Sequence, residues 1–544
     1  MTEVPTGFLH WILAVLPIIA LLVLLVPLHW RAPEAAPVAM FIAGLVALIA
    51  FRTPLETVAV AGGKGVWDAV FILYVIWPAL LLYQVTKQAG AYDALRKHIT
   101  KFSHNELFII LALCWVFASF LQGIAGFGAP VAVVVPLLIA VGVKPTYSVA
   151  MGVLAHAWAR FFGTLGVGWL ATVRVANLHQ LTHAAFEAGA VILIPAYLAG
   201  LMVVWWYGRG PAVRHAWPLV LILGTILGVG QMLVTLFSPE LSTFLAAAVA
   251  MLALYPLSRW RRYRDPVEGI PVRPAMAESP LTQAEEKEPV MGMGMSFLPY
   301  IVLPVVTLCV LKIPGLNHLL SKWRVGLAFP QVTTGYHVTN PAISKYAPIT
   351  VLTHPGTMLL VTAIVVFIVY RAGGYYGAWT SRQASEGHAR ERIGPGLIYD
   401  AIPASVPVIA FLVTSRVLDH SGQSLTIAHG IASVAPPKVY AAIASVIGAL
   451  GAFMTSSSTA SNVLFAGVQA DVAQLHSLPL NTIIASQAAG SAYGNAIAPA
   501  NIVLGTSVAG IKGQEGAVLR LTIGWTAAVA VLTGILTVIL VLIE

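Results

Sequence analysis

Long apolar stretches separated by short polar loops run along nearly the whole 544-residue chain. A helix needs about 20 apolar residues to cross the hydrocarbon core of a bilayer. By this measure the pattern predicts membrane spans at 8–28, 37–51, 66–86, 106–121, 188–207, 217–237, 241–257, 296–312, 349–370, 398–418, 438–454 and 521–543. The fold class that follows is an all-α polytopic membrane protein. No basic segment precedes the first stretch and no small-residue cleavage site follows it, so we interpret it as the first helix.

Two further apolar regions, 130–170 and 462–511, are interrupted by Gly, Pro, Ser and Asn, so their helix count stays open. Each follows an apolar helix that ends in a break, with the sequence FLQGIAGFGAP at 120–130 and FMTSSSTASN at 453–462. By helix parity, the two preceding helices enter from opposite faces of the membrane. This order predicts two inverted-topology repeats whose discontinuous helices or re-entrant hairpins meet near the midplane.

The breaks are the places where a substrate is expected to bind. Unwound backbone in a membrane must be buried in protein or line a wet cavity, and the free N–H groups of a half-helix suit a carboxylate. The hydroxyl and amide groups of the second break add donors or cation ligands. The candidate substrate-binding residues there are Thr455, Ser456, Ser457, Ser458, Thr459, Ser461 and Asn462, of which Ser458 and Thr459 are also candidates for ion coupling.

The glycines of the first break have two interpretations. Gly126 and Gly128 are candidates for the substrate site, together with Gln122. Alternatively, Gly123, Gly126 and Gly128 only allow transmembrane helices to pack closely. The pattern alone favours neither interpretation.

Charged residues at membrane depth are costly, so each is a functional candidate. Arg160 lies within the first interrupted region, where a guanidinium could bind a carboxylate through two hydrogen bonds. The alternative is an arginine that extends to the surface or pairs with a carboxylate elsewhere. His156 is four residues earlier and could relay a proton, although a satisfied structural histidine is the commoner case.

Other charges near the spans are expected to be structural. Arg416 and Asp419 have helical spacing near the end of one predicted span, so we expect them to pair with each other. Asp68 and Asp400 are expected to begin their helices, where a carboxylate stabilises the N-terminal end of the dipole.

Composition supports the membrane assignment. Apolar residues make up 58% of the chain and charged residues only 9%, whereas soluble domains carry roughly 25% charged residues. The two cysteines, Cys114 and Cys309, lie in apolar stretches and predict neither a disulfide framework nor a metal site. The net charge of +9 is explained by basic cytoplasmic loops, and nucleic acid is not an expected partner.

The basic residues also predict how the chain is organised. They concentrate in the loops 87–105 and 371–397, near Arg209 and Arg214, and at the start of a polar linker at 258–295. We therefore place these four segments in the cytoplasm, and the loop 313–348 outside despite its own basic residues. The predicted domains are an N-terminal transmembrane repeat at 1–257, the linker at 258–295 and a C-terminal repeat at 296–544.

At the two breaks the sequence resembles the lactate permease family. The stretch FLQGIAGFGAPVA at 120–132 is similar to the family's FLEGAAGFGAPVA, and TSSSTASNVLFAGVQ at 455–469 is similar to TGSDTSSNALFAALQ. Weaker likeness occurs in order over most of the chain. The resemblance implies a carrier of lactate or glycolate, coupled to protons, in the bacterial plasma (inner) membrane.

Five departures from the family pattern alter the charge of the expected site. Gln122 replaces a family Glu, Ser458 replaces an Asp, and Asn495 replaces a Lys, while Arg160 and Arg416 stand where apolar residues are expected. Neither Gln nor Ser titrates, so proton coupling through these positions is not expected. Arg160 is expected to replace the missing lysine as the anion clamp, or the site favours a more highly charged anion.

The function we expect is secondary active transport of a small organic anion by alternating access, with a short monocarboxylate as substrate and H⁺ or Na⁺ as the only cofactor. The alternative is a sodium-coupled or uncoupled carrier of a dicarboxylate or sulfonate, and an anion channel is a third possibility. An enzyme is not expected, because no nucleophile with a base and no metal-ligand cluster is evident. The expected partners are the anion, the lipid bilayer and, in a homodimer, a second copy.

Overall fold

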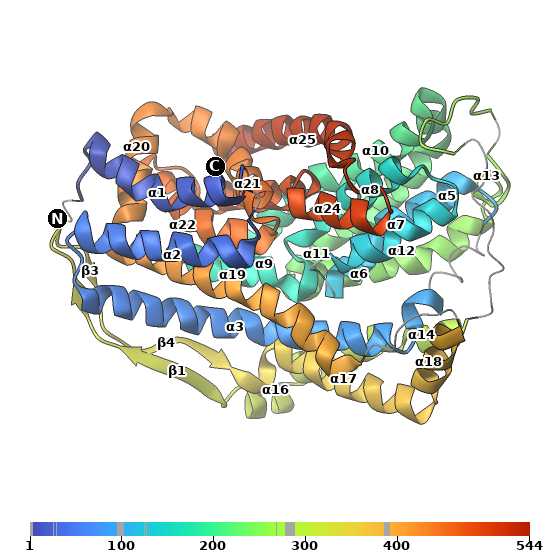
Figure 1. Ribbon diagram of the computed structural model, residues 1–544, viewed down its shortest axis with the longest axis horizontal. Coiled ribbons are helices and arrows are strands. Elements are labelled where there is room, and N and C mark those ends of the chain that lie inside the picture. The colour runs from blue at the N-terminus through green and yellow to red at the C-terminus, as the bar shows by residue number, and fades with distance from the viewer. Residues whose placement is uncertain are drawn as a thin grey trace.

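The computed structural model describes residues 4–25, 27–28, 30–94, 103–124, 126, 128–267, 269–277, 289–385 and 392–544. Much of the predicted linker, at 278–288, lies outside the described residues, as do the basic residues at 96, 97, 101 and 390. Helices account for most of the described chain (Figure 1).

The first half of the chain contains helices of very different lengths. They are α1 (Phe8–Leu25), α2 (Ala32–Ile49), α3 (Leu55–Lys87), α5 (Glu106–Leu111), the π-helix η1 (Ala112–Phe117), α6 (Ala118–Ile124), α7 (Ala129–Ala140), α8 (Pro145–Leu154), the 3₁₀ helix η2 (Ala157–Arg160), α9 (Gly163–Ala176), α10 (Leu181–Gly224), η3 (Thr225–Val229), α11 (Gly230–Thr235), η4 (Pro239–Leu241), α12 (Ser242–Arg259) and α13 (Arg261–Arg264).

The second half adds four short strands to its helices. The elements are α14 (Met293–Ser296), α15 (Leu298–Lys312), α16 (Pro314–Leu320), β1 (Arg324–Phe329), β2 (Val332–Thr333), β3 (Thr339–Asn340), β4 (Ile343–Thr350), η5 (Val351–Thr353), α17 (Pro355–Ala372), α18 (Tyr375–Ser385), α19 (Ile393–Ser421), α20 (Gln423–Val434), α21 (Pro437–Thr455), α22 (Ser458–Leu475), α23 (Leu480–Tyr493), η6 (Gly494–Ala496), α24 (Pro499–Val508) and α25 (Glu515–Ile543).

The structure confirms the predicted spans, with one exception. Within the described residues, ten helices are long and apolar enough to cross a membrane, and each predicted span except 296–312 overlaps one of them. That stretch forms α15, which has only 15 residues because it is followed at once by Pro314 and α16. The span 349–370 begins too early, because 349–353 belongs to β4 and η5 and α17 begins at Pro355. The spans 188–207 and 217–237 lie before and after a sharp bend in α10, at Gly208 and Arg209, whose backbone is not helical. The second span continues beyond α10 into η3 and α11.

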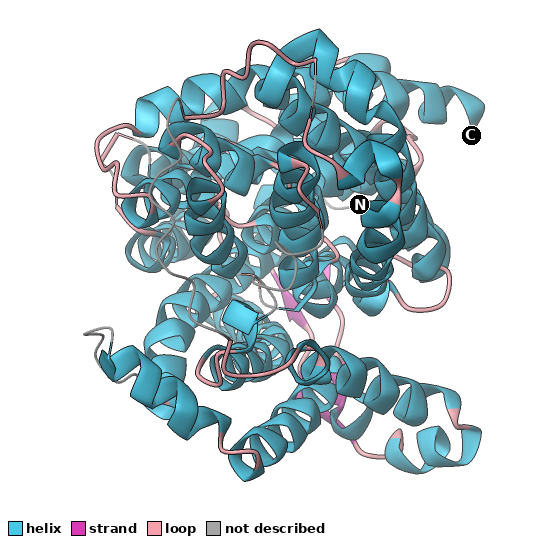
Figure 2. Ribbon diagram, turned by 90° about the vertical axis from the view of Figure 1, so that its right-hand side faces the viewer, coloured by secondary structure: helices cyan, strands magenta, loops and turns pink. Residues whose placement is uncertain are grey.

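The strands in 313–350 were not predicted, and they correct the all-α description for this loop. β1 pairs with β4, and β2 pairs with β3, both antiparallel. β1 and β4 are rich in Val, Ile, Phe and Tyr, residues that favour strands. Figure 2 shows these short strands among the helices.

The basic loops meet at one end of the molecule, at the right of Figure 1. Arg262 donates hydrogen bonds to the carbonyls of Arg214 and His215, each at 2.8 Å, and Arg382 forms an ion pair with Asp93 at 3.4 Å. The loop 313–348 runs from the opposite end, where Gly335 N–H donates to the carbonyl of Arg52, to the middle of α3, where the carbonyl of Ala347 accepts from Nε1 of Trp67 at 3.2 Å (Figure 1). The structure therefore supports the grouping of the loops, while the cytoplasmic location of that end stays a prediction.

The long helices pack in two groups. α19 packs along α2 and α3, and α17 also packs on α3 (Figure 1). α10, α21, α22 and α25 pack around α23, which lies close to the two regions of broken helix. Glycines allow the closest approaches: a Cβ at Gly65 would lie 2.6 Å from the Cα of Val413 in α19.

We predict that Gly490→Ala destabilises the protein, because a Cβ at this position in α23 would collide with the carbonyl of Ser445 in α21. The helices would have to separate, at a cost of about 1–3 kcal/mol. The thermal unfolding midpoint of the purified protein in detergent would fall. Gly524→Ala in α25 is the matched control, since no atom lies within 4 Å of the added Cβ. Equal midpoints for the two variants would contradict the prediction.

Candidate substrate site at the broken helices

The first break lies between α6, which ends at Ile124, and α7, which begins at Ala129. Gly128 caps α7 with a φ of 87°, a conformation that favours glycine. A Cβ at Gly126 would collide with the hydroxyl of Thr164, so this glycine allows close approach of two broken segments. Gly123 has the packing role instead, because its added Cβ would lie 2.8 Å from the Cα of Phe244 in α12.

A second interruption of the same half follows α8. The short helix η2 ends at Arg160, and the backbone then passes through three successive left-handed residues, Thr164, Leu165 and Gly166. Left-handed Thr and Leu are strained conformations, which persist only when the surroundings impose them. Gln122 lies beside this turn, since a Cβ at Gly163 would be 3.0 Å from its amide nitrogen.

The second half breaks in a similar way. Ser456 ends α21 in a left-handed conformation with a φ of 54°, and the hydroxyl of Ser457 caps α22 by accepting from the Ala460 N–H at 3.2 Å. Ser456 in turn accepts from the Ala500 N–H at 3.3 Å, at the start of α24. The breaks therefore bring the N-termini of α22 and α24 close together, with polar side chains at each.

The two halves meet at Arg160. Its Nη1 donates to Oδ1 of Asn495 in η6 at 3.3 Å, and its Nη2 lies 3.3 Å from Nε2 of His156. Arg160 is only 9% exposed, and His156 and Asn495 are fully buried. The guanidinium therefore does not extend to the surface, which excludes the snorkelling interpretation.

A buried polar stripe continues from Asn495 along α23. The Nδ2 of Asn495 donates to the carbonyl of Ser491 at 2.7 Å, one helical turn earlier. The hydroxyl of Ser491 lies 2.7 Å from that of Ser458 and accepts from Nδ2 of Asn462, also at 2.7 Å. Ser458 and Asn462, two of the predicted residues of the second break, therefore contact Ser491, which lies one helical turn before Asn495, the hydrogen-bond partner of Arg160.

Other predicted residues lie apart from this meeting point. Ser461 donates to the Gly448 carbonyl at 2.7 Å, which ties α22 to α21. Thr455 donates to the Gly451 carbonyl within its own helix at 2.8 Å, and Thr459 is half-buried in the first turn of α22. These residues support the break without pointing at Arg160.

Several buried polar atoms of the site have no hydrogen-bond partner among the described residues. They are Nε of Arg160, Nδ1 of His156, Oε1 of Gln122 and Oδ1 of Asn462. Buried polar atoms are nearly always paired, and each exception calls for an explanation. A ligand with a carboxylate and a hydroxyl would use both the free donor on Arg160 and the free amide oxygens.

Sequence reasoning missed three residues of the site. Thr164 forms the left-handed turn, Ser491 joins Ser458 to Asn495, and Asn501 donates to Oδ1 of Asn495 at 3.2 Å. Thr164 stands between Gly163 and Gly166, a spacing that could have indicated unwound backbone. Across the described ranges, no group of three His, Cys, Asp or Glu side chains could hold a metal ion.

Comparison with known proteins identifies the family. The L-lactate permease family model matches residues 10–544. The chain belongs to the L-lactate permease family. It is therefore a multi-pass membrane transporter of bacterial type, and not an enzyme.

The relatives of this permease-family chain are divergent but cover its length. The glycolate permease GlcA of Escherichia coli (strain K12) is 25% identical over 97% of this chain and 94% of its own length. The L-lactate permease of the same strain is 25% identical over 98% and 96%. The L-lactate permease of Streptococcus iniae is 27% identical over 85% and 90%.

Among solved structures, the Alcanivorax borkumensis YdaH transporter matches 88% of this chain and 86% of its own. The TM-score is 0.38 and the identity 15%, a similarity too low to transfer a topology. The inverted relation between the two halves of the permease-family chain therefore stays a prediction.

An ionic cluster holds α9 of this permease-family chain against the α3–α19 pair, and it corrects the prediction for Asp68. Asp68 lies in the middle of α3, fully buried, and not at a helix start. Its Oδ2 accepts from Nε of Arg416 and from the hydroxyl of Tyr346, each at 2.8 Å, and Arg174 lies 3.9 Å from its Oδ1. The predicted ion pair of Arg416 with Asp419 is confirmed at 3.9 Å, and Asp68 is a second, closer partner of Arg416.

Asp400 also differs from its prediction. It lies in the second turn of α19, whose first turn has no acidic residue, and accepts from Nε2 of Gln84 at 2.7 Å. Its role is to join α19 to α3 rather than to stabilise a helix dipole. Beside the Asp68 cluster is a small cavity of about 50 Å³, lined in part by Asp419 and by Asp471 of α22.

We predict that Asp68→Asn destabilises the protein by about 3–5 kcal/mol, because the buried guanidinium of Arg416 loses its nearest carboxylate and the partly buried one of Arg174 loses its ion pair. The free energy of unfolding, measured by titration with sodium dodecyl sulfate, would show this loss. Asp400→Asn is the matched control, since it weakens one hydrogen bond worth about 1 kcal/mol. A loss of less than 1 kcal/mol in Asp68→Asn would contradict the central role of this carboxylate.

Proposed function

We propose that this chain carries a short monocarboxylate, such as lactate or glycolate, across the bacterial plasma (inner) membrane, and that Arg160 holds the carboxylate. The observation that carries the proposal is a buried guanidinium with a free Nε, at the point where the broken helices of both halves meet. Relatives named for L-lactate and glycolate support the substrate class.

The chemistry of the site fits a small anion. An arginine buried at membrane depth is costly unless it has a functional partner. His156 and Asn495 orient the guanidinium through its two Nη atoms, and neither neutralises its charge. A carboxylate would supply that charge and a strong, charge-assisted hydrogen bond. The N-terminus of α22, close to Ser458, adds a favourable dipole.

Alternating access is the transport mechanism we propose. The packing supports a division into two parts, because α2, α3, α17 and α19 form one helical group and the broken segments are packed around α23 in another. In this proposal the second group, with Arg160 and Asn495, moves against the first. Arg174 and Asp68 lie at the boundary between α9 and α3.

The coupling ion follows from what the site lacks. Gln122 and Ser458 occupy the positions of the expected acidic residues and cannot exchange protons. We propose that a proton does not bind at these two positions and that the carrier is coupled to Na⁺ or is uncoupled. The hydroxyls of the second break, such as that of Ser458, are oxygen ligands for a cation.

A second candidate substrate is a dicarboxylate or sulfonate. It is favoured by the charge of the site, because the hydrogen-bond partners of Arg160 among the described residues, His156 and Asn495, are not acidic. A panel of radiolabelled lactate, glycolate, dicarboxylates and sulfonates, with and without Na⁺, distinguishes the two. Saturable counterflow exchange would rule out a channel.

We predict that Arg160→Gln raises the dissociation constant for the transported anion about 10- to 100-fold, because one charge-assisted hydrogen bond is lost. Arg160→Lys keeps the positive charge but lacks the planar guanidinium with its paired N–H donors, so its dissociation constant should rise less than that of Arg160→Gln. Binding is measured by scintillation proximity with radiolabelled substrate. Arg520→Gln, an exposed position in α25, is the control for loss of one positive charge. An unchanged affinity in Arg160→Gln would rule out the clamp.

We also predict that uptake does not depend on a pH gradient. Proteoliposomes containing the purified chain would be assayed with and without an inward proton gradient, with the membrane potential clamped. The initial rates of substrate uptake should agree within error. Accumulation driven by the gradient would contradict the prediction, and would assign the proton to another group, such as His156 or Asp471.

A further inference from the structure

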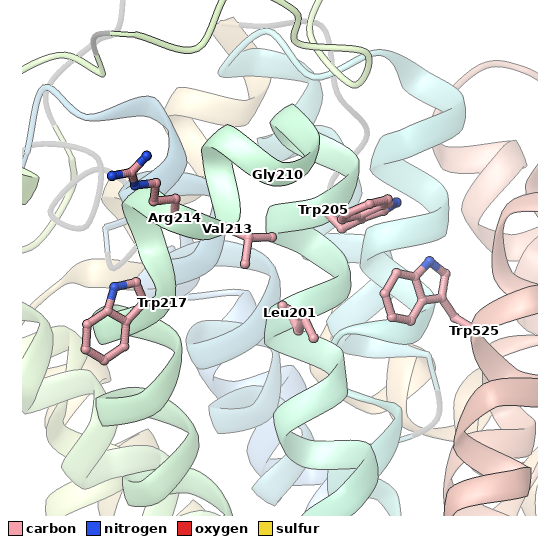
Figure 3. A pocket seen from close by; sticks show the side chains of 7 residues that line it. All are labelled: Leu201, Trp205, Gly210, Val213, Arg214, Trp217 and Trp525. Atoms are coloured by element: carbon pink, nitrogen blue, oxygen red, sulfur yellow. The ribbon is translucent and has the colours of Figure 1, made fainter.

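A tryptophan-lined groove lies between α10 and α25, away from the broken helices. α10 folds into a hairpin at Gly208 and Arg209, and its second leg runs back along the first, so that Tyr197 Oη lies 2.7 Å from Oγ1 of Thr225. The groove encloses about 540 Å³ at the tip of this hairpin (Figure 3). Its lining residues are Leu201, Trp205, Gly210, Val213, Arg214 and Trp217, with Trp525 of α25.

The walls of the groove are indole rings and aliphatic side chains. In Figure 3, Trp205 and Trp525 lie on one side of Leu201 and Val213, and Trp217 lies on the other. Trp205 and Trp217 are 40% and 56% exposed. Tryptophan is enriched at the level of lipid head groups, where one part of the ring is in an apolar environment and the N–H is in a polar one.

Positive charges gather at the same hairpin tip. Arg214 lines the groove one turn from Trp217, and the guanidinium of Arg209 lies 5.4 Å from the ring centre of Trp205. Arg262 is held nearby by its bonds to the carbonyls of Arg214 and His215. In the described part of the chain, neither Arg209 nor Arg214 forms an ion pair with a carboxylate, so their charges are available to an anion.

We propose that this groove binds an anionic phospholipid. The phosphate of the head group lies on the side of Arg209 and Arg214. The acyl-chain segments nearest the head group lie on Leu201, Val213 and Trp525. The charge fits, because basic side chains at the cytoplasmic surface attract anionic lipids. The location also fits, since the hairpin tip belongs to the end of the molecule where the basic loops gather.

A lipid explains the groove better than a soluble anion does. The surface next to the groove is apolar and exposed, since Leu221, one helical turn after Trp217, is 52% exposed. Such a surface faces acyl chains, so the groove opens to lipid along its length. A free phosphate would contact the arginines alone and would leave the indole walls unused.

The bound lipid would join elements that hold the candidate substrate site. α10 and α25 both pack on α23, which leads into Asn495, and α25 also packs on α8. A molecule wedged between α10 and α25 therefore stabilises their common contact with α23. This inference does not depend on the identity of the transported substrate.

The test compares lipids that differ only in head-group charge. Purified full-length protein in detergent is titrated with dioleoyl phosphatidylglycerol or dioleoyl phosphatidylcholine, and bound lipid is counted by native mass spectrometry. We expect tighter binding of phosphatidylglycerol. Arg209→Gln with Arg214→Gln should weaken it about thirtyfold, since each basic side chain contributes a factor of about five. Trp525→Ala, which keeps both charges, should weaken it as well.

The matched control is Arg371→Gln with Arg392→Gln, which removes two exposed charges at the same end of the molecule. This variant should bind phosphatidylglycerol as the unmodified protein does. Equal affinity for the two lipids, or equal binding by the groove and control variants, would overturn the proposal. Binding of glycerophosphoglycerol as tightly as the intact lipid would also overturn it, because the site would then be one for a soluble anion.

Discussion

The arrangement of this transporter depends on one constraint: backbone that leaves the helix within an apolar membrane must find its hydrogen bonds inside the protein. The broken segments satisfy this constraint through contacts inside the protein: Gly126 lies against Thr164, and Arg160 is hydrogen-bonded to Asn495. Polar side chains complete the contacts, as when Ser456 accepts from the N–H at the start of α24. The same contacts place Arg160 beside Asn495, so the packing of broken helices also creates the candidate substrate site.

The site and the Asp68 cluster use buried charge in different ways. Asp68 receives two hydrogen bonds and one further cation, so α3, α9, α19 and β4 are tied together by a neutralised contact. Arg160 has only uncharged partners and keeps an unpaired Nε. A buried ion pair between protein side chains, such as Asp68 with Arg416, stabilises the fold. A buried cation without an acidic partner, such as Arg160, is a candidate for binding an anionic ligand.

Two residues that differ from the expected family pattern, Asn495 and Ser458, lie on the same buried polar stripe. Asn495 stands where the family pattern has a lysine, and the cation at this place comes instead from Arg160, which is bonded to Asn495 across 335 residues of sequence. Ser458, in the place of an expected aspartate, bonds to Ser491 on the same stripe.

Sequence by itself determined the membrane class, most of the spans and the two breaks, because these follow from local composition and from the high cost of polar groups in lipid. It also singled out Arg160, which the structure shows to be buried. It did not determine the partners. Asp68 meets Tyr346 and Arg416 across 278 and 348 residues, and nothing local to Asp68 distinguishes such a hub from a helix-capping carboxylate. The strands at 324–350 and the roles of Gly123 and Gly126 were likewise decided by tertiary structure, because they depend on which surfaces come into contact.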